Sequence, residues 1–369
     1  MSELDRIVNV RISKETSTIS QKSFGVPLIV FESDSETWDD AWDATLEEGE
    51  IKTFSNTGEI LEAFPKTGNS GKNVAATDFY KTAAAILSQN PKVLKLQIGR
   101  ITSEGDAADL TADLQGFAQK NGDFYFIVPA FEIDELQADV GGRWRALPQF
   151  ADESERIIFC SPKGNENLFG NNANSLAKLW TGYTKCVVMA NSPQEFAWAA
   201  WVGEGAPFDP GSSTWAYKRL AGITPLASSG ANFSAITRDG NWANIYHTVY
   251  GKSITEQGKC TSGEWIDIEI GIDWLKVRLQ EAVYADLIQA RKISYDDVGI
   301  QIIRSTIANI LQQAAQMGII QGDTIEIETP LFADIPAADV GKRHLPDMRF
   351  SAKVLNAIHT TIIDGRVTL

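Results

Sequence analysis

The chain has 369 residues, of which 43% are hydrophobic and 22% are charged, which is close to the average of globular proteins. This composition argues against long disorder, collagen and coiled coils, and the length suggests two or three domains of roughly 150 residues each. Lys and Arg number 33 against 48 Asp and Glu, and the resulting formal net charge of −15 argues against a protein whose main task is to grip nucleic acid.

The N-terminal part predicts two strands. Residues 7–12 are β-branched and partly alternating, and residues 24–30 form a continuous apolar run. The polar stretch 13–23 separates them, so the first strand is able to pair far from its own domain. Between Glu32 and Glu50 there are nine carboxylates and no Lys or Arg.

From residue 78 the sequence alternates between helix and strand. Apolar spacing predicts helices that contain Phe79–Leu87, Leu110–Phe117, Leu176–Trp180 and Glu195–Val202. Apolar runs predict strands at 92–98, 124–128, 156–160 and 185–190. A repeated helix-plus-strand unit builds a largely parallel sheet. We therefore predict an α/β fold class, with an open α/β domain over 21–205.

The remaining chain predicts a second, α+β domain. Residues 206–240 are rich in Gly, Pro and Ser and are expected to connect the two domains. Within 241–350 we expect a hairpin around Gly251, a helix over 264–290 and a strand over 324–329. Between the last two we expect a second helix that is capped by Ser294, carries Asp296 and Asp297 in its first turn and ends at Gly318.

The C-terminal end also predicts strands. Residues 348–363 and 366–369 flank an Asp-Gly pair, which is a hairpin signal. Strand-like segments thus lie at both ends of the chain, as arms over 1–20 (with a linker) and 351–369. A strand with unpaired N–H and C=O groups is a template for association. The ends pair either inside this molecule or with another, and the sequence leaves both possibilities open.

Motifs for catalysis and cofactor binding are missing from the sequence. No G-x-G-x-x-G follows a strand, residues 68–73 lack the spacing of a phosphate loop, and no G-x-S-x-G occurs. His247, His344 and His359 are isolated, and structural or surface roles are favoured for them. We expect no catalytic, cofactor or metal site. The ten Trp residues are expected mostly in the core, although some are able to anchor subunits.

Cysteine spacing and the N-terminal sequence suggest a reducing compartment. Cys160, Cys186 and Cys260 are an odd number at wide spacing, which indicates neither a disulfide framework nor a zinc site. The opening MSELDRIVNVRIS lacks the features of a signal peptide, and no run approaches the ~18 apolar residues of a membrane span. We expect synthesis in the cytosol and no membrane insertion.

Five blocks of sequence, in order along the whole chain, together resemble the contractile tail sheath proteins of tailed bacteriophages, in the DUF3383-type branch. These blocks are RIVNVRIS with FGVPLIVFES, DFYKTAAAILSQNPKVLKLQIGRI, SSTWAYKRLAGITP, ITEQGKCTSGEWIDIEIGIDWLKVRLQEAVYADL and FSAKVLNAIHTTIIDGRVTL. The acidic stretch 32–50 has no counterpart in this resemblance, and we interpret it as a surface insert.

The resemblance implies a structural subunit and not an enzyme. Such sheaths stack as hexameric rings around a tail tube and contract to drive the tube through the host envelope, so the partners would be further copies, the tube protein, and baseplate and terminator proteins. The location would be the virion, after assembly in the host cytoplasm. Neither direct nucleic-acid binding nor a cofactor is implied.

The resemblance also implies roles for particular residues. Terminal arms would add strands to a small sheet in neighbouring subunits. The N-terminal arm would use Ile7, Val8, Val10 and Ile12, and the C-terminal arm Val354, Leu355, Ile358, Ile362, Ile363, Val367 and Leu369. Candidate tube-facing charges in the C-terminal sheath core domain are Lys276, Arg278, Arg291 and Lys292, although a solvated helix face explains each of them equally well.

Two other functions stay open on the sequence. One is a non-contractile tail or baseplate structural protein, and the other is an α/β enzyme whose site lacks a recognisable motif.

The last 28 residues carry a net charge of +3 against an acidic remainder, which predicts that the basic tail docks beside acidic residues of a neighbouring copy.

Overall fold

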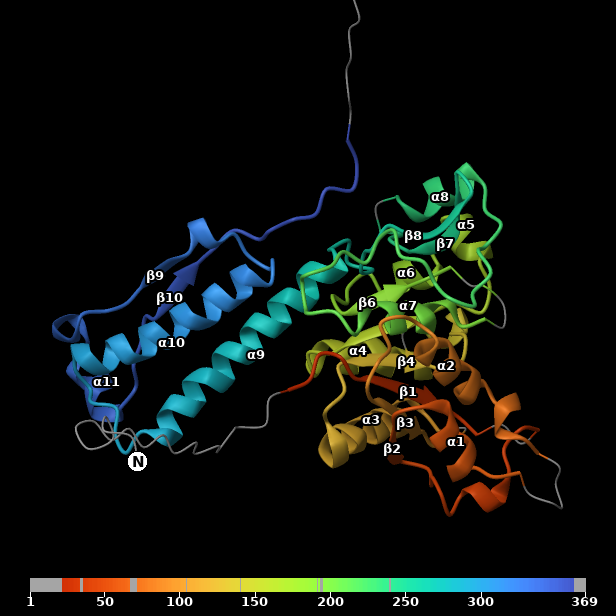
Figure 1. Cartoon of the computed structure of the whole chain (residues 1–369), viewed down its shortest axis with the longest axis horizontal. Coiled ribbons are helices and arrows are strands. Elements are labelled where there is room, and N and C mark those ends of the chain that lie inside the picture. The colour runs from red at the N-terminus through yellow and green to blue at the C-terminus, as the bar shows by residue number, and fades with distance from the viewer. Residues whose placement is uncertain are drawn as a thin grey trace, which may run out of the picture.

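The computed structural model describes residues 22–33, 36–66, 72–103, 105–139, 141–190, 192, 195–238 and 240–361. Figure 1 shows a large α/β body and one long helix, α9 (Ile266–Gln289), that runs away from it. A smaller C-terminal unit packs along the outer part of this helix. The N-terminal arm and residues 362–369 of the predicted C-terminal arm lie outside the described residues.

A six-stranded sheet forms the centre of the body, in the order β2-β3-β1-β4-β5-β6. Five strands are parallel, and β2 is an antiparallel edge strand beside β3. The strands are β1 (Pro27–Phe31), β2 (Glu50–Phe54), β3 (Leu96–Arg100), β4 (Phe126–Pro129), β5 (Ile157–Cys160) and β6 (Cys186–Val188). The predicted α/β class and largely parallel sheet are confirmed.

Helices cover both faces of this sheet because its strands are apolar on both sides. In β1, Ile29 and Phe31 face one core, whereas Leu28 and Val30 face the other. The first face carries α1 (Thr57–Ala63), α2 (Asp78–Leu87) and α7 (Ala197–Gly205). The second carries α3 (Ala107–Asn121), α4 (Ala146–Glu153), α5 (Glu166–Phe169), α6 (Leu176–Leu179) and α8 (Gly230–Ile236).

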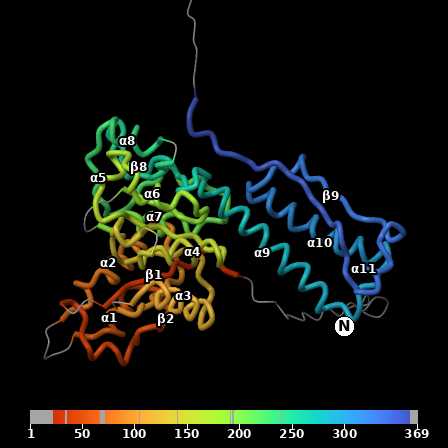
Figure 2. The backbone as a smooth tube through the Cα atoms, turned by 180° about the vertical axis from the view of Figure 1, so that it is seen from behind, coloured from red at the N-terminus to blue at the C-terminus, as the bar shows by residue number. Residues whose placement is uncertain are grey.

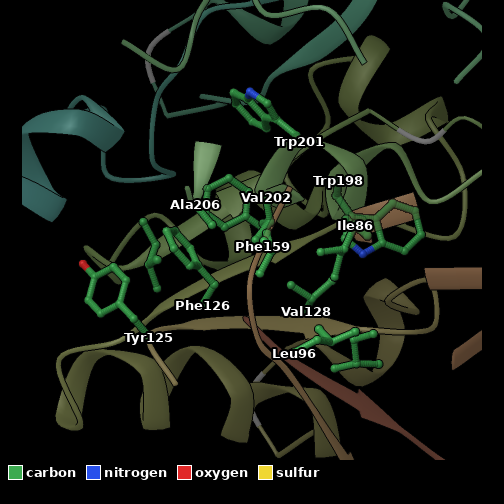
Figure 3. Packing of buried hydrophobic residues seen from close by; sticks show 14 of the residues in the cluster. Ile86, Leu96, Tyr125, Phe126, Val128, Phe159, Trp198, Trp201, Val202 and Ala206 are labelled. Atoms are coloured by element: carbon green, nitrogen blue, oxygen red, sulfur yellow. The ribbon is translucent and has the colours of Figure 1, made fainter. Parts of the chain in front are cut away.

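Aromatic side chains fill the first core. Figure 3 shows Trp198 of α7 beside Ile86, and the ring of Trp201 meets Phe159 of the sheet edge to face, with ring centres 5.5 Å apart. The Trp198 indole N–H donates to the carbonyl of Pro129 and that of Trp201 to the carbonyl of Trp215, each at 3.0 Å. Both indoles therefore pack in the core with their polar atoms paired, as expected for buried Trp.

The acidic stretch 32–50 is built into this core, so interpreting it as a surface insert is wrong for its apolar residues. Trp38, Trp42 and Leu46 are buried, and so is Asp39, whereas the side chains of Glu36, Asp40, Glu47 and Glu48 are exposed. Arg100 lies 4.4 Å from the Trp38 ring centre and donates to Asp43 at 2.5 Å. The two indoles therefore anchor the segment, and Asp43 is paired with the body while other acids of the segment stay exposed.

Residues 206–240 also belong to the body rather than joining two separate domains. Trp215 and Leu220 are buried, and Trp215 packs against Phe126, Phe159 and Trp201. The following hairpin, β7 (Ile245–Val249) and β8 (Lys252–Glu256), turns at Tyr250 and Gly251, as predicted. It begins at the free edge of β6, where Asn244 exchanges backbone hydrogen bonds with Val188 and Ala190.

The boundary predicted at residue 241 thus falls within the body, because this hairpin covers a sheet edge. The C-terminal unit proper consists of α9, α10 (Asp297–Gln316), β9 (Glu326–Glu328), α11 (Ala337–Lys342) and β10 (Arg349–Ser351). Short 3-10 helices complete the structure at Asp40–Trp42, Val74–Ala76, Glu135–Gln137, Arg143–Arg145, Gly322–Thr324 and Phe332–Asp334.

Helices α9 and α10 run side by side in both views, and β9 and β10 form a two-stranded antiparallel sheet on their outer side (Figures 1 and 2). The N-cap of α10 is Asp296 and not the predicted Ser294: the Asp296 carboxylate accepts a hydrogen bond from the Gly299 amide at 2.9 Å, and the Ser294 hydroxyl donates to that carboxylate at 2.7 Å. The buried positions Ile300, Ile303, Ile310 and Leu311 give α10 one apolar face.

Candidate assembly surfaces

A buried polar joint fixes the root of α9 to the body. Lys185, immediately before β6, donates to Asp273 at 2.8 Å and to Glu269 at 2.5 Å. The Tyr125 hydroxyl donates to the other oxygen of Asp273 at 2.6 Å. The side chains of Lys185 and Asp273 are only 9% and 6% exposed. The joint therefore holds two carboxylates, one ammonium and one phenol almost without water.

The charges of this joint shift the pKa values of its members. Burial alone would lower the pKa of Lys185, but the charges and hydrogen bonds of Asp273 and Glu269 outweigh it and raise that pKa. Burial, followed by the charge of Asp273, raises the pKa of Tyr125 well above its ordinary value. Both groups therefore stay protonated at neutral pH, and both stay hydrogen-bond donors.

A second contact lies one helical turn further along α9. The Glu281 carboxylate accepts from the Lys22 amide at 2.8 Å, and Arg278 donates to the Lys22 carbonyl at 3.0 Å and to Glu281 at 2.5 Å. The Arg278 guanidinium also lies 5.8 Å from the Phe24 ring centre. Arg278 and Glu281 therefore fix the point at which Lys22 meets α9.

The four candidate tube-facing charges fall into two groups. Arg278 is mostly buried, and Lys276 pairs with Glu155 of the body. Arg291 and Lys292 instead line a groove of about 830 Å³ beyond the end of α9, together with Arg343, and its walls include Ile300 and Val340. The structure therefore brings only Arg291 and Lys292 together, at the tip of the C-terminal unit.

Apolar surface is concentrated on the C-terminal unit. Among the described residues, seventeen large hydrophobic side chains are exposed, and eleven of them lie between Ile272 and Ile358. Those on the two long helices are Ile272, Tyr284, Leu287, Ile288, Val298 and Ile302. Large exposed apolar patches mark interaction sites.

The small sheet of this unit has open edges. Strand β9 pairs only with β10 in the described part of the chain, and the residues of β10 are all exposed. Each strand therefore has one side whose N–H and C=O groups can receive another strand. The described residues thus include a site suited to strand addition, next to the apolar helices.

The described part of the predicted C-terminal arm returns from this sheet to the body. Val354 forms a single antiparallel bridge with Ile320, and the Leu355 amide donates to the Ile319 carbonyl at 3.0 Å. Beyond them, Leu355 is 48% and Ile358 is 87% exposed. The chain from 352 to 361 has no regular strand, unlike the strand predicted there.

His247 has the structural role that the sequence favoured, although its partners could not be predicted. His247 lies 2.9 Å from Ser228 and 2.5 Å from Glu256, and Phe233 stacks on its ring, so it braces the β7–β8 hairpin. His359 contacts the body. Elsewhere in the described residues, no group of three or more His, Cys, Asp and Glu side chains is arranged to hold a metal ion. No described helix is long and apolar enough to cross a membrane.

Two solved structures with the same architecture are sheaths in the contracted state. A chain of the anti-feeding prophage (AFP) helical sheath in its contracted state matches with a TM-score of 0.68 at 11% identity, over 97% of this chain and 98% of that one. A chain of the contracted PVC sheath, from an extracellular contractile injection system, matches with a TM-score of 0.69 at 10% identity, over 97% of both chains. The fold is that of these sheath assemblies.

Two further matches extend the comparison. A chain of the AFP baseplate structure matches with a TM-score of 0.67 at 11% identity, over 98% of both chains. The sheath tail protein from Desulfitobacterium hafniense matches with a TM-score of 0.55 at 11% identity, over 87% of this chain and 93% of that protein. No sequence-family description matches the chain, and no curated protein matches it either.

Proposed function

We propose that this protein is a structural subunit of a contractile sheath. The observation that carries the proposal is the agreement in fold over at least 97% of this chain with chains of two contracted sheaths. That agreement includes both the α/β body and the C-terminal unit. It is independent of the five sequence blocks, which led to the same family by a different route.

In its finer form, the proposal is a bacteriophage tail sheath of the DUF3383-type branch. The subunits would form stacked hexameric rings around the tail tube, and contraction would drive the tube through the host envelope during genome ejection. Baseplate and terminator proteins would close the two ends. The particle would be assembled in the cytoplasm of the host bacterium. These details rest on the resemblance of the sequence.

The open edges of β9 and β10 support the proposed role of the arms. An arm that adds a strand to this sheet would gain main-chain hydrogen bonds, and its alternate side chains would reach the exposed apolar surface of α9 and α10. In the N-terminal arm, Val8, Val10 and Ile12 alternate and would point to one face, and Ile7 would point to the other. At the other end, Ile358, Ile362 and Val367 would contribute to the C-terminal arm.

The tip of the C-terminal unit is the proposed tube-facing region. Arg291 and Lys292 lie there beside Arg343, in a groove with both apolar and charged walls. Lys276 and Arg278 are already paired within the subunit, to Glu155 and Glu281. Arg291 and Lys292 are therefore the stronger pair among the four candidates.

A second candidate function is a baseplate structural protein, favoured by the match to a chain of the AFP baseplate structure. The two candidates differ in the assembly that they predict. A sheath subunit forms long tubes, whereas a baseplate subunit stops at a ring or smaller complex.

Negative-stain microscopy of the purified protein tests the proposal. We expect helical tubes, or rings that stack. Removing residues 1–14, or residues 360–369, should abolish the tubes and leave a folded subunit with an unchanged circular dichroism spectrum. The second deletion keeps the Val354–Ile320 bridge, so it spares the C-terminal unit. Unchanged tubes after both deletions would contradict the arm model, and a persistent small monomer would contradict the sheath.

A further inference from the structure

One side chain fastens the C-terminal segment to the body. Of residues 355–361, His359 is the only one that is not exposed. Its Nε2 lies 2.8 Å from the Thr214 hydroxyl, and its carbonyl accepts a hydrogen bond from the Tyr217 hydroxyl at 2.8 Å. The imidazole also meets Trp265 edge to face, with ring centres 4.6 Å apart, and Tyr217 at 5.6 Å.

The cage around His359 is made entirely by the body and the root of α9. Thr214 and Tyr217 come from the segment after α7, and Trp265 is the residue before α9. The cage therefore recognises a ring, a ring nitrogen and a backbone carbonyl together.

The rest of the segment is poorly held. Its root is fixed by the Val354–Ile320 bridge, and the residues between the bridge and the cage leave Leu355 and Ile358 largely in solvent. Exposed Ile and Leu gain free energy when another surface covers them. The segment thus combines one specific attachment to its own subunit with apolar side chains that this attachment leaves uncovered.

We propose that the Thr214–Tyr217–Trp265 cage is a clasp that stores the C-terminal segment on its own subunit, and that His359 must leave the clasp before the segment pairs with a second copy of this chain. The inference rests on the proposed function for the identity of the partner. A stored segment limits premature association, because the His359 carbonyl is engaged by the Tyr217 hydroxyl and is not available to a strand of a second copy. Opening the clasp couples release of the segment to contact between subunits.

Mobility of the segment tests the clasp on the isolated subunit. A nitroxide attached at Ala357→Cys reports on the segment alone, because Cys160, Cys186 and Cys260 are buried. His359→Ala should narrow the lines of the label's electron paramagnetic resonance spectrum to those of a mobile chain. The double variant Thr214→Val with Tyr217→Phe, which changes the cage instead, should have the same effect. His344→Ala, which changes an exposed histidine at the far tip, should leave the spectrum unchanged. A spectrum that His359→Ala does not alter would overturn the clasp.

Assembly tests the second half of the inference. The double variant Thr214→Cys with His359→Cys, joined by a short bismaleimide, should lose tube formation, whereas His359→Ala should shorten the lag before tubes appear several-fold. Tubes formed by the cross-linked protein at an unchanged rate would refute the release step. If the unmodified chain forms no tubes, the proposed function fails, and the nitroxide comparison still decides whether the clasp exists.

Discussion

Replacing Lys185 with Met should be among the most destabilising single changes that leave the hydrophobic core intact. The methionine keeps most of the apolar length of the lysine and removes its charge. Asp273 and Glu269 would then lie close together at the root of α9 with no ammonium between them. The Tyr125 hydroxyl would stay as a donor to Asp273 alone.

The distances set the size of the effect. Lys185 lies 2.8 Å from Asp273 and 2.5 Å from Glu269, and each attraction is about 6 kcal/mol at an effective dielectric constant of ~20. The cost of taking these charges out of water offsets most of that gain in the native protein. Removing the Lys185 ammonium leaves the carboxylates buried without the attraction that offset their desolvation. We therefore expect a loss of about 3–5 kcal/mol in the free energy of unfolding.

Urea unfolding of the subunit, carried out below the concentration at which it assembles, measures this loss. Lys276→Met is the matched control, because Lys276 is 52% exposed and pairs only with Glu155. Its loss should stay below about 1 kcal/mol, as for surface ion pairs. Adding Asp273→Asn to Lys185→Met should restore part of the stability. Equal losses for the two lysine variants would refute the reasoning.

Two other predictions concern alkaline pH and salt. The pKa of Tyr125 is raised above its ordinary 10.0, so above that pH the unfolded chain loses a proton that the folded chain keeps, and stability should fall by about 1.4 kcal/mol per pH unit from this group. In urea unfolding between pH 9 and 11, the free energy of unfolding of Tyr125→Phe should fall less steeply with pH than that of the unmodified protein. If the two proteins lose stability with pH in parallel, the phenol is not buried as described. Because residues 342–369 carry +3 against an acidic remainder, light scattering should show weaker assembly at high salt, and salt-independent assembly would contradict docking of the basic tail.

Much of the body was predictable because its strands and helices follow simple periods. The helix that contains Phe79 and Leu87 and the strand that ends at Cys160 both appear where the apolar pattern predicted them. The pattern failed at 32–50, where the density of carboxylates concealed Trp38 and Trp42. Single indoles can anchor a segment whose average composition is that of a solvated surface.

The periodic pattern of apolar residues does not predict the polar joint at the root of α9 or the cage around His359. Glu269 and Asp273 are four residues apart in α9, and Asp273 is followed by the buried Trp274, so the sequence does place acids beside an apolar face of this helix. Nothing in the sequence identified Lys185 as their partner, since the contact spans 88 residues. For His359, the cage comes from residues more than 90 positions away, and local pattern carries no information about them.

The uneven burial of α9 gives the subunit a mechanical lever. The helix has 24 residues and is therefore about 36 Å long, and its root is fixed at Asp273 while its outer part carries the tip. From that root to Gln289 the helix extends about 24 Å, so a tilt of about 10° at the joint displaces the tip by about 4 Å. A small rotation at the joint is thus multiplied into a shift of about three quarters of a helical turn at the far end.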